Sequence, residues 1–166
     1  TTSRFSPDGQ QNYGVTTGES KNLAAVKTGS YTTTMTFDST YGITTKQVTL
    51  GESLSHDIAG TEYVSGTYTT TSDASVNSGI AGIKQIDGYG TVRESVTLGL
   101  SQRPDDLGVM KTIGSYTTTS RFSPDGQQNY GVTTGLSKNL AGTSIGSYTT
   151  TMTFDLTYGI TTKQVT

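Results

Sequence analysis

An almost literal internal repeat constrains this chain more than any other feature of its sequence. Residues 1–49 and 118–166 align at a constant offset of 117 residues, and 43 of the 49 aligned positions are identical. A shorter repeat inside the long one carries the motif G-[ST]-Y-T-T-T, which begins at Gly29, Gly66, Gly114 and Gly146. Such copies are typical of one supersecondary unit repeated in space.

The repeat defines the predicted organisation of the chain. Residues 1–117 form one long unit, with short units that start near residues 29, 66 and 114, and residues 118–166 form a partial second copy of residues 1–49. Both chain ends fall inside a repeated motif, because Thr1 aligns with Thr118 and Thr166 with Thr49. Domain boundaries usually lie in linkers. We therefore expect either a piece of a longer array or a chain whose ends are completed by neighbouring molecules.

The repeated segments have the period-two pattern of half-buried β-strands. In residues 31–37, alternation places Tyr31, Thr33, Met35 and Phe37 on one face and three threonines on the other. The same parity recurs in the segments that begin at Tyr116 and Tyr148. It predicts a repeated aromatic core on one face, made of Tyr31, Phe37, Tyr116, Phe122, Tyr148 and Phe154.

Turn signals separate these strands. The sequence Ser-Pro-Asp-Gly at residues 6–9 and 123–126 combines a fixed Pro φ, an Asp that hydrogen-bonds the next backbone groups and a Gly that accepts positive φ. Residues 38–42 and 155–159 predict similar connections, and residues 86–89 predict a third hairpin. Residues 103–107, with Pro before two acidic residues, predict at most one short turn of helix.

Composition limits how deep a core these strands can build. Thr, Ser and Gly supply 75 of the 166 residues, whereas Leu, Ile, Val and Phe supply 31. The formal net charge is only −2, so the low apolar content does not come with the high charge of a disordered chain. We predict an all-β fold of short antiparallel strands and hairpins in a tandem-repeat architecture, either a β-sandwich-like or a stacked β arrangement.

Few residues are available for catalysis or cofactor binding. The chain has no Cys and a single His, and Ser55-His56-Asp57 is consecutive in sequence, whereas a catalytic triad converges from separate loops. We therefore predict no enzymatic activity, no catalytic residue, no bound metal and no cofactor. Turn carboxylates such as those of Asp8, Asp38 and Asp105 leave Ca²⁺ as a weaker alternative, since no known calcium loop is present.

The charge pattern also limits the partners. Eleven basic residues, with no cluster among them, do not make the dense Lys/Arg surface that nucleic acid requires. No apolar run of 18 residues is present, so we expect no membrane span.

A tyrosine before a glycine recurs in the repeat and is the candidate assembly or ligand site. These residues are Tyr13, Tyr41, Tyr89, Tyr130 and Tyr158. Their rings could stack on sugars, although packing across a hairpin explains the pattern more simply. Rows of T-x-T, as in residues 32–36 and 149–153, resemble the rows of ice-binding β proteins and could also carry O-linked sugars.

These features favour a structural role over a chemical one. The leading hypothesis is a non-enzymatic subunit of an extracellular fibre, pilus, sheath or surface layer, which assembles with itself by β-strand pairing or exchange. The alternative is a cell-surface adhesin or carbohydrate-binding repeat module that binds glycans. The third hypothesis is an ice-binding protein.

Overall fold

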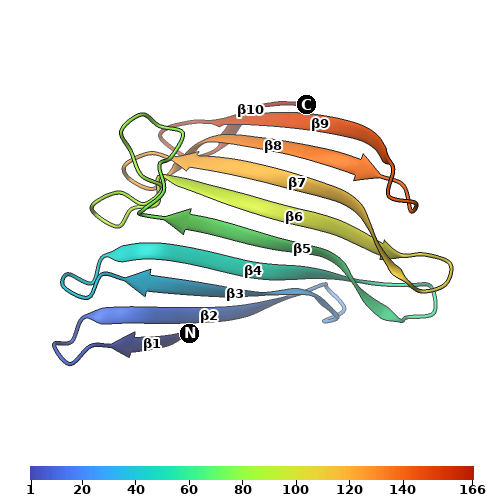
Figure 1. Ribbon diagram of the computed structural model, residues 1–166, viewed down its shortest axis with the longest axis horizontal. Coiled ribbons are helices and arrows are strands. Elements are labelled where there is room, and N and C mark those ends of the chain that lie inside the picture. Colours follow the sequence, from blue (N-terminus) through green and yellow to red (C-terminus); the bar gives the residue numbers. More distant parts are fainter.

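Ten β-strands make up the computed structural model, which describes residues 1–166 (Figure 1). Eight of them have 11 to 13 residues each and form the body of the molecule, and two short strands flank them. Their bounds are β1 Thr2–Phe5, β2 Gln11–Lys21, β3 Lys27–Phe37, β4 Thr44–His56, β5 Glu62–Asp73, β6 Glu94–Pro104, β7 Met110–Phe122, β8 Gln128–Lys138, β9 Ser144–Phe154 and β10 Thr161–Val165.

The strands form one open antiparallel sheet in which spatial order equals chain order, β1 to β10. The all-β prediction is confirmed, and of the two architectures left open the structure has the single sheet rather than a sandwich. The strands are longer than the short ones expected. β1 and β10 lie at opposite edges of the sheet, as Figure 1 shows. The fold contains no helix that could cross a membrane.

One turn geometry closes six of the connections between strands and one hairpin inside the connection between β5 and β6. Each turn begins with Ser, Asp or Asn. The backbone N–H of this first residue donates a hydrogen bond to the carbonyl of the residue four positions later, and its own carbonyl accepts one from the N–H of the residue three positions later. Six of these turns end in a glycine with φ between 77° and 86°, a conformation that a Cβ disfavours. Ala25 occupies this position in the seventh turn with a φ of 62°. The turns begin at Ser6, Asn22, Asp57, Asp87, Asp105, Ser123 and Asn139.

The structure agrees with the predicted turns at residues 6–9, 123–126, 38–42, 155–159 and 86–89. It contradicts the helical turn expected over residues 103–107. Strand β6 runs through Pro104, and Asp105 opens one of the seven repeated turns, with Gly108 at a φ of 77°. Asp at the first turn position outweighed the Pro signal because its carboxylate accepts the N–H groups of Leu107 and Val109.

Burial is scarce because a single sheet has no second layer. Ten residues are buried, and six of them are glycines. Ile86 is the only buried hydrophobic residue, with 1% of its surface exposed. It belongs to the connection between β5 and β6, residues 74–93, which we call the long connection. Figure 1 shows this connection as the green loops at one end of the sheet.

Buried polar contacts attach the long connection to the sheet. The carboxylate of Glu94 accepts hydrogen bonds from the Gly79 N–H at 2.8 Å and from Arg121 Nε at 3.0 Å. Arg93 Nε donates to the carbonyl of Phe122, and Gln85 Oε1 accepts from the N–H of Asp73. Charged side chains and backbone groups therefore hold the long connection against the sheet.

Candidate functional site

The two faces of the sheet have different chemistry. The face that carries Tyr31, Thr33 and Met35, with the residues paired to them, is called the tyrosine face. The opposite face carries Thr32, Leu50 and Leu98 and is called the leucine face. The predicted alternation of residues 31–37 is confirmed by the pairing of β3 with both neighbours. Neither face is covered, so the face predicted to be a core is only half-buried.

A continuous threonine row crosses the tyrosine face. It contains one threonine from each of β2 to β9 and the terminal threonines beside β1 and β10. Neighbouring hydroxyls in this row are hydrogen-bonded in alternate pairs, with O–O distances of 2.8 to 3.1 Å. The row consists of Thr1, Thr16, Thr33, Thr49, Thr70, Thr97, Thr118, Thr133, Thr150 and Thr166.

Beside the threonine row lies a second row in which glycine and tyrosine alternate. It reads Gly18, Tyr31, Gly51, Tyr68, Gly99, Tyr116, Gly135 and Tyr148 from β2 to β9. Each ring lies over the glycine of the preceding strand: a Cβ built on Gly99 would be 2.1 Å from Tyr116 Cζ, and one on Gly135 would be 2.3 Å from Tyr148 Cζ. The glycines are therefore required for the rings to lie on the sheet.

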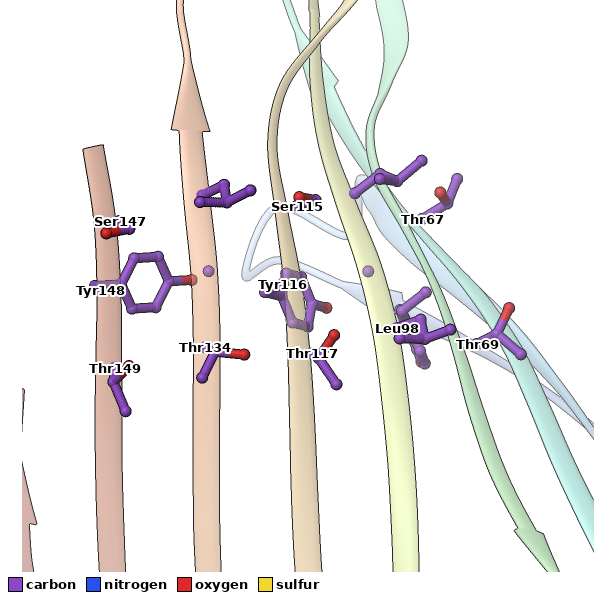
Figure 2. A pocket seen from close by; sticks show the side chains of 15 residues that line it. Thr67, Thr69, Leu98, Ser115, Tyr116, Thr117, Thr134, Ser147, Tyr148 and Thr149 are labelled. Atoms are coloured by element: carbon purple, nitrogen blue, oxygen red, sulfur yellow. The ribbon is translucent and has the colours of Figure 1, made fainter. Parts of the chain in front are cut away.

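Figure 2 shows two of these rings, with Tyr148 extended from β9 across to β8 and its hydroxyl directed away from its own strand. The rings at the two ends of the row, Tyr31 and Tyr148, are 38% and 41% exposed. Burial, with a smaller effect from Tyr68 and Tyr148, raises the pKa of the Tyr116 phenol. Tyr116 therefore stays a neutral hydroxyl near physiological pH.

The leucine face carries a hollow of about 670 Å³. Leu98, Leu100 and Leu136 line it, together with threonine and serine side chains of β5 to β9 (Figure 2). Smaller hollows continue across β4 and β3 toward β2. Leu98 is 58% and Leu136 44% exposed, so these side chains are apolar surface rather than core.

The T-x-T segments lie on the leucine face, where pairing breaks up the expected threonine rows. Thr34 pairs with Val48, Val48 with Thr71, and Thr71 with Val96, so threonine alternates with valine across the sheet. The adjacent row alternates threonine with Leu50 and Leu98. The unbroken threonine row is on the other face, and only the pairing register reveals it.

The five candidate tyrosines before glycine all lie at one end of the sheet but fall into two groups. Tyr41, Tyr89 and Tyr158 are at the tips of connections and are exposed. Tyr13 and Tyr130 lie within β2 and β8, and guanidinium groups lie over their rings, with Arg4 at 5.4 Å and Arg121 at 5.3 Å from the ring centres. The structure does not gather the five into one cluster.

The six residues predicted as a strand core also divide. Tyr31, Tyr116 and Tyr148 belong to the tyrosine–glycine row described above. Phe37, Phe122 and Phe154 end strands β3, β7 and β9 and are half-buried. The ring of Phe37 lies 3.7 Å from the position that a Cβ on Gly14 would occupy, so it also contacts the tyrosine face.

The consecutive Ser55, His56 and Asp57 make separate contacts. His56 Nε2 lies 3.8 Å from a carboxylate oxygen of Glu62, and the Asp57 carboxylate accepts the backbone N–H groups of Ala59 and Thr61. The Thr61 hydrogen bond contributes most to lowering the pKa of Asp57.

The carboxylates of the other turns likewise accept hydrogen bonds from groups of their own turns. Hydrogen bonds from Ser6 and Ser123 lower the pKa of Asp8 and Asp125. Asp38 accepts the N–H groups of Thr40 and Tyr41. No group of three or more His, Asp or Glu side chains is arranged to hold a metal ion.

Comparisons of the chain with known protein families, with curated proteins and with solved structures find no match. The functional argument therefore depends on the surfaces of the sheet and on its edges.

Proposed function

We propose that the protein is a non-enzymatic structural subunit that extends its sheet by strand pairing with further copies of itself. The observation that carries this proposal is the sequence of the two edge strands. Residues 1–5 of the β1 edge recur as residues 118–122 of β7, and residues 161–165 of β10 recur as residues 44–48 of β4. Strands β7 and β4 each pair on both sides.

The edge sequences are therefore able to pair on their free side as well. An edge strand offers unpaired N–H and C=O groups to another chain. The bonded threonine row supports the same proposal, because it reaches Thr1 at one edge and Thr166 at the other without a break in register. Head-to-tail pairing that does not close produces a filament. An extracellular fibre, sheath or surface layer is the setting that we propose.

The low charge of the chain is consistent with this assembly. A formal net charge of −2 gives little repulsion between copies. Each edge strand carries one basic residue, Arg4 or Lys163, and these side chains lie on the leucine face, where the equivalent Lys46 pairs with Asp73 at 3.1 Å. Strand β1 has no acidic residue, so continuation of the threonine row into the next copy would place its Arg4 opposite Lys163, a like-charge pair at the exposed leucine face that salt would screen.

Two proline variants of β10 test the proposal. In an antiparallel strand, successive residues direct their N–H groups to opposite sides, so one of Gln164→Pro and Val165→Pro removes a donor to β9 and the other removes a donor at the free edge. We expect both purified variants to retain β circular dichroism. The free-edge variant should lose the concentration-dependent increase in sedimentation that we expect of the parent chain.

The proline variant that removes a donor to β9 is the matched control for the effect of the free edge. It weakens the β9–β10 hairpin but leaves the outer donors in place, so it should assemble better than the free-edge variant. Equal assembly of the parent and both variants would contradict pairing through β10. Absence of assembly by the parent chain at high concentration would contradict the proposed function as a whole.

A further inference from the structure

The tyrosine face contains a regular surface without charged residues, although the chain has 24 of them. Four neighbouring rows of this face contain no Asp, Glu, Lys or Arg. Two are the threonine row and the tyrosine–glycine row. A third alternates serine and glycine, as Ser20, Gly29, Ser53, Gly66, Ser101, Gly114, Ser137 and Gly146. The fourth includes Gly14, Met35, Gln47 and Ser72 on β2 to β5.

Most charged side chains of the central strands are on the other face, and Arg103, which continues the tyrosine-face alternation of β6, lies beyond the serine–glycine row. Glu19, Lys46, Glu52, Asp73 and Arg121 all occupy leucine-face positions in the pairing register. These four rows therefore present hydroxyl groups and aromatic rings without a charged side chain among them. Its partner should be uncharged and rich in hydroxyl groups itself.

The aromatic rings are regularly spaced. The row has one tyrosine on every second strand, and all four rings lean in the same direction, over the glycine of the preceding strand. Strands lie about 4.8 Å apart, so successive rings are about 9.6 Å apart and the surface from β2 to β9 is about 34 Å long. That ring spacing is close to the disaccharide repeat of an extended β-1,4-linked polysaccharide.

The surface around the rings is also shallow. Glycine and serine neighbours beside the tyrosine row leave no side chain taller than a hydroxyl on that side. A pyranose ring of a flat polymer could therefore contact a tyrosine through its apolar face, while the threonine and serine hydroxyls bond the equatorial hydroxyls at its edges.

We propose that this tyrosine row is a linear binding site for an uncharged, extended β-1,4-linked polysaccharide of the cellulose or chitin type. The sugar contacts are at Tyr31, Tyr68, Tyr116 and Tyr148, and not at the exposed connection tips. The inference goes beyond self-assembly and does not require it, because the site lies within one chain.

A depletion assay tests the site directly. The protein is mixed with microcrystalline cellulose or with chitin powder, the solid is removed, and the protein left in solution is measured. A sample without polysaccharide corrects for sedimentation of self-assembled material. We expect depletion by at least one of the two polymers, and the two arms show which sugar is preferred. If neither polymer removes the parent protein, the inference is overturned.

Two arginine variants separate the faces of the sheet without changing a tyrosine. Ser137 and Ser147 are both exposed, but Ser137 lies beside the tyrosine row and Ser147 lies on the leucine face. Ser137→Arg should lower the affinity by roughly tenfold or more, because the long side chain obstructs the polymer. Ser147→Arg should bind as the parent does. Equal binding by both variants, or equal loss, overturns the assignment.

Ring variants then identify the contact. Tyr116→Ala should weaken binding roughly two- to tenfold, and Tyr116→Phe, which retains the ring, should stay within about twofold of the parent. Tyr41→Ala and Tyr158→Ala at the connection tips should have no effect. A loss confined to the tip variants would overturn the row as the binding site.

Discussion

The long connection and the repeated sheet use opposite means to stay folded. The long connection, residues 74–93, holds the only buried hydrophobic residue, Ile86, and is attached through the buried Glu94 to Arg121 and to the backbone of Gly79. The sheet has no such centre, and most of its buried residues are glycines. Its strands contact only their neighbours, through hydrogen-bonded ladders and cross-strand pairs.

The comparison shows how a repeat can grow without a deeper core. A sheet whose strands depend only on adjacent strands gains the same contacts with each added hairpin, as in a one-dimensional repeat. Substitutions in the long connection should therefore be costly, and those on the faces of the sheet should be mild. The predictions that follow test this difference, in order of decreasing effect.

The largest expected loss is at Ile86. Ile86→Ala should lower the free energy of unfolding by about 3 kcal/mol, because it leaves a cavity in the only packed region. Leu98→Ala, at a 58% exposed position on the sheet, should cost about 1 kcal/mol or less. Urea unfolding followed by circular dichroism measures both. Similar losses in the two variants would remove the proposed difference between the regions.

Removing the charge of Glu94 should have the next largest effect. Glu94→Gln keeps the shape of the side chain but leaves Arg121 without its carboxylate partner, at an expected cost of about 2 kcal/mol. The control is Glu52→Gln on the sheet, whose carboxylate bonds only the Ser30 hydroxyl. This control should change stability by less than about 0.5 kcal/mol. A larger loss of stability in Glu52→Gln than in Glu94→Gln would show that the buried Glu94–Arg121 contact is not the more important polar interaction.

The repeat provides a natural control for turn strain. Ala25 has a φ of 62° where its counterpart in the second copy, Gly142, has 84°. Ala25→Gly should stabilise the protein by about 0.5–1 kcal/mol, since glycine accepts this conformation without a Cβ clash. Gly142→Ala should destabilise it by a similar amount, as measured by thermal unfolding. A destabilised Ala25→Gly variant would show that local strain is not what distinguishes the two hairpins.

Acid should weaken the contact of the sheet with the long connection by a smaller amount. Hydrogen bonds from Ser75, followed by Lys46, lower the pKa of Asp73 from 3.8 to about 2. A lowered pKa means that the ionised group stabilises the fold at neutral pH and that this contribution is lost as the pH falls from about 4 toward 2. Asp73→Asn should therefore lose less stability than the parent between pH 6 and pH 3. An equal loss in both proteins would exclude Asp73 as a source of the acid sensitivity.

The local structure of the repeat was readable from the sequence. Alternation in residues 31–37 gave the correct faces, and the Ser-Pro-Asp-Gly and Asp-to-Gly segments marked the turns. These signals are local, because side-chain parity and turn chemistry depend on a few consecutive residues. The expected helical turn at residues 103–107 was wrong for a local reason too: Asp105 begins the same turn as Asp57 and Asp87.

The candidate surfaces were not readable, because they depend on register between strands. Tyr116 and Gly99 are neighbours only because the β6–β7 hairpin contains one bulge, between Ser101 and Gln102. A shift of one residue would reverse the two faces. The threonine row and the tyrosine–glycine row exist only in the assembled sheet. The hairpin at residues 86–89 was predicted, but the burial of Ile86 and the contacts of Glu94 with Gly79 and Arg121 were not, because the long connection has no counterpart elsewhere in the repeat.

Negative-stain electron microscopy of the concentrated parent protein tests the central claim most directly, because extension of the sheet through β1 and β10 must change particle shape. The account predicts filaments that lengthen with concentration, with strands running across the filament axis and a spacing of about 4.8 Å along it in fibre diffraction. Discrete particles of one size at every concentration would contradict it, because the edges of β1 and β10 would then remain unpaired.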